Sequence, residues 1–173
     1  MSKRTRQYIG VLAAAAAYYI IHEGAHLAYA AFAGVFRQIK FIGLGVQIDV
    51  FAERMTAAQL GMFCLAGALA TFCAGYLLIV LSKRICRAKS KLLRAALYYI
   101  TIAMLLIDPL YLSALCGLFG GGDMNGIAQL LPEWAARVLF GALLAANAVM
   151  FLKKVLPVYK KSFSDTEKEE WTN

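Results

Sequence analysis

Four long apolar stretches constrain the fold of this chain more than any other feature of its sequence. Each is long enough for a helix to cross a bilayer, which takes roughly 20 predominantly apolar residues. Hydrophobic residues make up 61% of the 173 residues and charged residues only 16%, which is too apolar for a soluble domain of this length. The stretches cover approximately residues 8–36, 57–81, 95–119 and 134–156. The sequence therefore predicts an all-α polytopic membrane protein with about four transmembrane helices.

The connections between these stretches indicate how the rest of the chain is organised. We expect a single membrane-embedded domain over residues 1–173, because no linker is long enough to separate two domains. Residues 37–54 contain two β-rich runs on either side of "GLG" and predict a short membrane-associated β-hairpin, with a short interfacial loop as the alternative. At membrane depth, such backbone must be covered by protein or line a cavity. Residues 158–173 are polar and predict a cytoplasmic tail with a frayed end.

The positive charge is concentrated on one side of the predicted spans. The net charge is +8, and fourteen of the 18 Lys and Arg residues precede the first span, connect the second to the third, or close and follow the fourth. In a four-span protein these three places share one side of the membrane, so the positive-inside rule puts both termini in the cytoplasm. This placement favours the lipid bilayer over nucleic acid as the partner of the basic residues.

The segment "HEGAH" places three ionisable residues inside the first apolar stretch. His22 and His26 are four residues apart, so on a helix both imidazoles share a face and can bind one metal ion. Glu23 lies about 100° around the helix and can reach water at that metal. This pattern predicts a Zn²⁺ site with Glu23 as general base for hydrolysis. The alternative is two histidines that merely hydrogen-bond their neighbours. However, charged groups at a span centre cost roughly 2.5–3.5 kcal/mol each, and a metal accounts for all three residues.

The third metal ligand is expected to be a carboxylate, because a catalytic zinc usually has three protein ligands and the chain has no third histidine. Asp108 and Asp123 are the candidates near the membrane. Asp123 follows three glycines, whose backbone can turn it toward the first span, so we favour it over Asp108, which precedes Pro109. Asp108 and Asn125 are then expected to orient a ligand or to serve as an alternative one.

These motifs resemble the site-2 protease family of intramembrane zinc metalloproteases. "HEGAH" matches the HExxH motif of the family, and "AGVFRQIKFIGLG" resembles the membrane-associated strands that follow it. "GGGDMNGIAQL" resembles the distal aspartate motif, and "AGALAT" lies where the family has GPxxN, with Ala68 and Thr71 in place of proline and asparagine. The resemblance covers roughly residues 18–132 and includes no PDZ or CBS segment, as in short members of the family.

The resemblance implies a zinc metalloendopeptidase that hydrolyses a peptide bond in or near a transmembrane segment of a membrane-protein substrate. It implies zinc on His22, His26 and Asp123, with Gly67 and Thr71 near a substrate cleft, in a multi-pass protein of a bacterial plasma membrane. Family members usually run the HExxH helix from outside to inside, opposite to the direction that the basic residues predict. Two other functions remain open: a catalytically inactive protease-like protein that binds metal or partner helices, and a metal-handling membrane protein.

Overall fold

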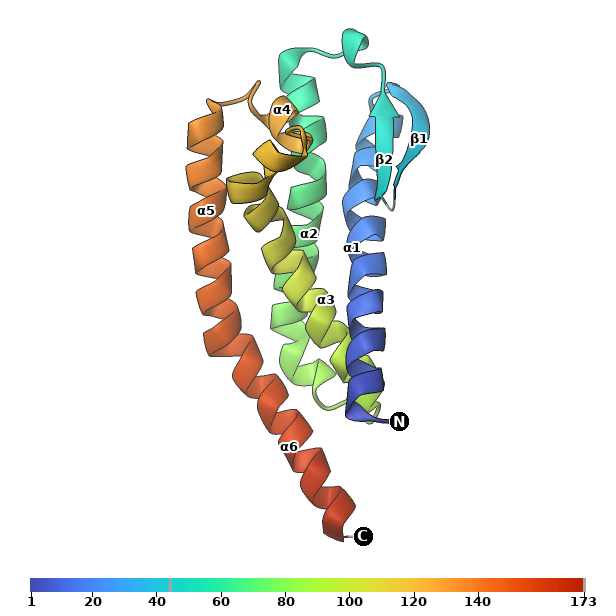
Figure 1. The fold of residues 1–173 in the computed structure, drawn as a ribbon, viewed down its shortest axis with the longest axis vertical. Coiled ribbons are helices and arrows are strands. Elements are labelled where there is room, and N and C mark those ends of the chain that lie inside the picture. Colours follow the sequence, from blue (N-terminus) through green and yellow to red (C-terminus); the bar gives the residue numbers. More distant parts are fainter. Residues whose placement is uncertain (44, 173) are drawn as a thin grey trace.

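The computed structural model describes residues 1–43 and 45–172, which form long helices side by side and one β-hairpin (Figure 1). Two π-helical turns, Tyr111–Leu115 and Phe151–Val155, continue α3 and join α5 to α6. In chain order the elements are α1 (Lys3–Phe32), β1 (Phe36–Ile42), β2 (Gly45–Val50), α2 (Ala57–Ile85), α3 (Lys91–Leu110), α4 (Asp123–Ile127), α5 (Glu133–Met150) and α6 (Leu156–Thr172). The predictions of a helical protein and of a hairpin between its first two long helices are confirmed.

Three helical segments are long and apolar enough to cross a membrane, namely Ala57–Ile85, Lys91–Leu118 and Glu133–Ser164. The first of the four predicted spans is not among them, although α1 is 30 residues long. Its polar residues, among them His22, Glu23 and His26, lower its mean hydropathy. The residues that suggest a function are therefore also the ones that weaken the signal of a span.

The helix α1 nevertheless packs firmly against the other helices, on the side of the fold that carries the hairpin (Figure 1). Its interface with α3 is the most extensive between any two elements, and it also packs along α2. On its other side it contacts β2, whose Ile48 is buried. The strands β1 and β2 are antiparallel, with Ile39 opposite Ile48 and Phe41 opposite Val46.

A proline inside α3 is accommodated by a polar side chain from α5. Pro109 has no N–H to donate to the carbonyl of Leu105, one helical turn earlier. Asn147 supplies the missing donor, since its Nδ2 lies 2.9 Å from the Leu105 oxygen. The Tyr76 hydroxyl of α2 in turn donates to Asn147 Oδ1 at 2.8 Å. This buried chain of hydrogen bonds joins three long helices at the level of the proline.

The C-terminal segment differs from its prediction. Residues 158–172 continue the helix α6, where the sequence predicts a frayed end. Pro157 does not interrupt the helical run, because the π-helical turn just before it widens the backbone at that level. Lysine and glutamate, which are good helix formers, make up six of the fifteen residues 158–172.

The two ends of the molecule differ in character. Both termini and the α2–α3 connection lie at one end, whereas the hairpin and α4 lie at the other (Figure 1). The three basic segments that the sequence analysis expects on one side of a membrane are thus at the same end of the fold. Which side of a membrane this end faces stays a prediction.

Candidate metal centre

Three potential metal ligands converge from two distant parts of the chain. His22 and His26 project from α1, and Asp123 is the first residue of α4. The two His Nε2 atoms are 3.1 Å apart, and Asp123 Oδ2 lies 3.2 Å from His22 Nε2 and 3.5 Å from His26 Nε2. The ligand atoms of this group all lie within 4.8 Å of one another, so the three residues could hold a metal ion.

The second ring nitrogen of each histidine faces an acceptor. His26 Nδ1 lies 2.8 Å from the Phe63 carbonyl oxygen, and His22 Nδ1 lies 3.1 Å from Asp108 Oδ1. The latter contact is close, although the ring N–H is not aligned for an ideal hydrogen bond. Metal-binding histidines almost always have such a partner, because it fixes the ring and leaves Nε2 for the metal.

This arrangement brings three acceptors together. When both Nδ1 atoms carry the proton, the two Nε2 lone pairs and the Asp123 carboxylate face one another without a donor between them. Such a cluster is repulsive unless a proton or a cation lies within it. A proton on an Nε2 atom would instead let that imidazole donate a hydrogen bond to Asp123, and such bonds outweigh burial, which raises the Asp123 pKa, and lower it to about 2. Asp123 is therefore ionised at neutral pH, as a metal ligand must be.

Asp108 lies on the far side of His22 from Asp123. Its side chain is buried, with Oδ1 accepting from the Tyr18 hydroxyl at 2.5 Å and Oδ2 accepting from the Thr71 hydroxyl. Its two oxygens are thus committed to Tyr18, Thr71 and His22 Nδ1. The structure thus places Asp108 beside His22 Nδ1 and Asp123 beside both Nε2 atoms, and which of the two is a ligand stays a prediction.

Gly67 of α2 allows the two imidazoles to lie against the helix backbone. A Cβ added at this position would lie 2.6 Å from both His22 Cε1 and His26 Nε2, which is a steric clash. Gly67 and Thr71 lie behind the histidines and are not among the residues that line the adjoining cavity. Their expected place in a substrate cleft stays a prediction.

Three consecutive glycines turn the chain back toward α1 before Asp123. Gly120, Gly121 and Gly122 have φ values of 77°, 87° and 47°, a region that residues with a Cβ rarely adopt. Asn125 is exposed, and its Nδ2 donates to the Gly120 carbonyl at 3.0 Å. It braces this turn, whereas Asp108 is the carboxylate that lies beside His22 Nδ1.

A cavity of about 630 Å³ adjoins the three ligands. Glu23, which is half-buried, lines it together with the ligands, and so do residues 45–48 of β2 and parts of α3. The Ile48 backbone lies beside the Glu23 carboxylate.

Two other carboxylates form ion pairs away from this cavity. Asp49 pairs with Lys40 at 2.8 Å, which lowers the Asp49 pKa, and Glu133 pairs with Arg137 at 2.7 Å.

The sequence analysis did not identify Tyr18, the Phe63 carbonyl or the steric role of Gly67. Tyr18 precedes His22 by one helical turn and therefore shares its face, which is a signal that could have identified it. Neither the Phe63 carbonyl nor the close approach at Gly67 has a signature in the sequence, because both depend on how α1 packs on α2. No family model, curated protein or solved structure matches this chain.

Proposed function

We propose that this protein is an intramembrane zinc metalloprotease that hydrolyses a peptide bond in or near a transmembrane segment of a membrane-protein substrate. The observation that carries the proposal is the convergence of His22, His26 and Asp123 beside Glu23 in one cavity. Two imidazoles and a carboxylate are a common donor set of catalytic zinc, which keeps a fourth position open.

The distances fit such an ion. Ligands about 2.0–2.1 Å from a tetrahedral zinc are about 3.3 Å from one another. The three separations between the ligand atoms are 3.1, 3.2 and 3.5 Å. Bound zinc would supply Lewis acidity, which activates water and polarises a peptide carbonyl.

The remaining steps belong to the chain itself. Glu23 accepts a proton from the attacking water while the water oxygen bonds to the carbonyl carbon of the substrate. Glu23 then delivers this proton to the amide nitrogen when the C–N bond breaks. Asp108 and the Phe63 carbonyl hold the imidazoles in position through their Nδ1 atoms. An intact general base beside the ligands favours hydrolysis over a metal-handling function or an inactive binder.

In this proposal α1 is the fourth span. Thirty residues of helix extend roughly 45 Å, enough to cross a bilayer. Its polar residues are shielded, because His22 and His26 are buried against α2 and α4. The basic residues support cytoplasmic termini, which would put the metal centre nearer to the opposite surface of a bacterial plasma membrane.

The substrate must be extended where it is cleaved, since the carbonyls of a transmembrane helix are engaged in its own hydrogen bonds. In the two-stranded sheet, β2 pairs only with β1, so no strand pairs with its other edge among the described residues. That strand contributes residues 45–48 to the cavity. An extended substrate segment can therefore add to β2 and satisfy its freed backbone groups.

The test uses purified protein reconstituted with transmembrane peptides, whose cleavage products are identified by mass spectrometry. We expect cleavage that a chelator abolishes and added zinc restores. Glu23→Gln should keep about one zinc per chain and lose activity by roughly 10²–10⁴-fold, because glutamine cannot accept the proton. His22→Ala should lose both zinc and activity. Cleavage by Glu23→Gln at the wild-type rate would refute the proposed mechanism.

A further inference from the structure

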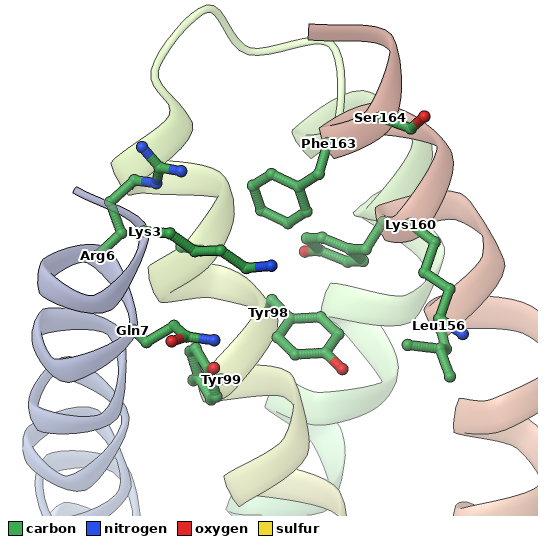
Figure 2. Close-up of a pocket in the computed structure, with 11 residues that line it drawn as sticks. Lys3, Arg6, Gln7, Tyr98, Tyr99, Leu156, Lys160, Phe163 and Ser164 are labelled. Atoms are coloured by element: carbon green, nitrogen blue, oxygen red, sulfur yellow. The ribbon is translucent and has the colours of Figure 1, made fainter. Parts of the chain in front are cut away.

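A second cavity, of about 480 Å³, lies at the end of the molecule opposite the metal centre. It opens between the first turns of α1, the beginning of α3 and the helix α6 (Figure 2). No residue of the metal centre lines it. The proposed hydrolysis therefore makes no use of it.

The lining of this cavity combines positive charge with aromatic surface. Lys3 and Arg6 come from α1 and Lys160 from α6, and no carboxylate is among the lining residues. Figure 2 shows the Lys3 side chain extending from α1 toward the aromatic rings of α3 and α6. Among the side chains that the structure describes, neither Lys3 nor Lys160 forms an ion pair. Lys3 and Lys160 therefore have no carboxylate partner among the described side chains.

A buried tyrosine closes one wall of the cavity. Tyr159 lines it and is only 1% exposed, with its hydroxyl oxygen fully buried. The Thr101 hydroxyl, which donates to the Leu97 carbonyl at 2.7 Å, lies beside the Tyr159 hydroxyl and can accept from it. Tyr159 therefore contributes aromatic surface to the wall, while its hydroxyl lies out of reach of a ligand in the cavity.

The walls are held in place before any ligand arrives. Arg94 of α3 lies over the Phe163 ring at 5.3 Å and donates to the Ser162 carbonyl at 2.9 Å. Ser162 donates in turn to the Cys86 carbonyl at 2.9 Å, which fixes α6 to the end of α2. A preformed site loses little conformational entropy when it binds.

We propose that this cavity binds the phosphate head group of an anionic phospholipid. Lysine and arginine are suited to a phosphate, and the tyrosine rings match the aromatic residues that collect at the membrane–water interface. Basic pockets between membrane helices on the cytoplasmic side are typical sites for anionic lipids. Two of the walls belong to segments apolar enough to span a membrane, so the acyl chains can continue along their surface.

The test measures lipid retention by the full-length protein. The protein is exchanged from nanodiscs that contain phosphatidylglycerol and phosphatidylcholine into detergent, and the retained lipids are counted by native mass spectrometry. The pocket variant is Lys3→Gln with Lys160→Gln. Its matched control is Lys83→Gln with Lys89→Gln, which removes the same charge from exposed positions at the same end but outside the cavity. Circular dichroism confirms that both variants are folded.

We expect preferential retention of phosphatidylglycerol that falls roughly tenfold or more in the pocket variant and is unchanged in the control. Equal retention in all three proteins, or an equal loss in both variants, would overturn the proposal. A competition arm adds inorganic phosphate at millimolar concentration. Displacement of the lipid by phosphate alone would show that a free phosphate compound, and not a lipid, is the ligand.

Discussion

Asp108 illustrates how much of the candidate centre depends on a residue that is not a proposed ligand. It receives hydrogen bonds from Tyr18 and Thr71 and faces His22 Nδ1, so one buried carboxylate connects α1, α2 and α3 behind the metal position. Thr71 stands where the resembled family has an asparagine. In this chain its hydroxyl donates to Asp108, which lies beside His22 Nδ1.

The two aspartates should therefore differ in their effect on metal binding. Asp123→Asn removes a charge that faces both Nε2 atoms, and we expect it to abolish zinc binding and activity. Asp108→Asn keeps the Nε2 face intact and should retain most of the metal, with activity lower by the roughly 10–100-fold that is typical of residues that orient ligands. Zinc content after identical dialysis measures the difference. The reverse ranking would transfer the ligand role to Asp108.

Gly67 offers a test of the packing behind the histidines. In Gly67→Ala the new methyl group would lie 2.6 Å from atoms of both imidazoles, so α2 or the rings must move. We expect zinc affinity to fall by roughly tenfold or more, since displaced ligands no longer share one position. Gly24→Ala is the control, because a Cβ there meets nothing within 4 Å. A chelator titration compares the two variants, and equal affinities would contradict the structure at α1 and α2.

At the scale of the elements, the direction in which the helices cross the membrane is the main prediction. Single cysteines are introduced at Lys89 and at Lys40 in a background that lacks the native cysteines. We expect a membrane-impermeant maleimide to label the Lys40 variant in intact cells and to spare the Lys89 variant, because the α2–α3 connection belongs to the basic end. External labelling at Lys89 would invert the orientation and match the usual direction in the resembled family.

The elements also show why sequence patterns predict some features and not others. Composition and length were sufficient to predict membrane-spanning segments in α2, in α3 and in the long C-terminal helix, because these helices are apolar over a sufficient length. The hydropathy of α1 is too low to meet the same criterion, because this helix contains the polar residues of the candidate metal centre. The hairpin follows from β-rich runs around glycines. For the third metal ligand, the sequence could only reduce the choice to Asp108 and Asp123. These residues lie 86 and 101 positions after His22, and only tertiary packing brings them close to it.

At the scale of the whole molecule, a metal at this centre would connect the first helix to a segment that follows the third. His22 and Asp123 are separated by 101 positions in the sequence. A cross-link that closes a loop of this length restricts the unfolded chain, and for a disulfide of about 100 residues the entropic model gives roughly 4.7 kcal/mol. Metal binding should therefore stabilise the fold as well as activate water.

We accordingly expect a chelator to lower the thermal unfolding midpoint of the wild-type protein in detergent, and added zinc to restore it. Asp123→Asn should unfold at a lower temperature that is insensitive to the chelator, because it no longer binds the ion. Glu23→Gln should respond as the wild type does. A wild-type midpoint that does not change on chelation would mean that the ion, if bound, contributes nothing to holding α4 against α1.

The glycine turn also has a consequence for the order of events during synthesis. Asp123 emerges from the ribosome only after α1, α2 and α3, so a growing chain carries the two histidines long before it carries the complete ligand set. If the protein is the proposed protease, a partly synthesised chain that is already inserted in the bilayer has the general base but lacks the third metal ligand. Catalysis would begin only when the turn has formed and α4 has docked, which delays proteolysis until most of the protein's own helices are in place.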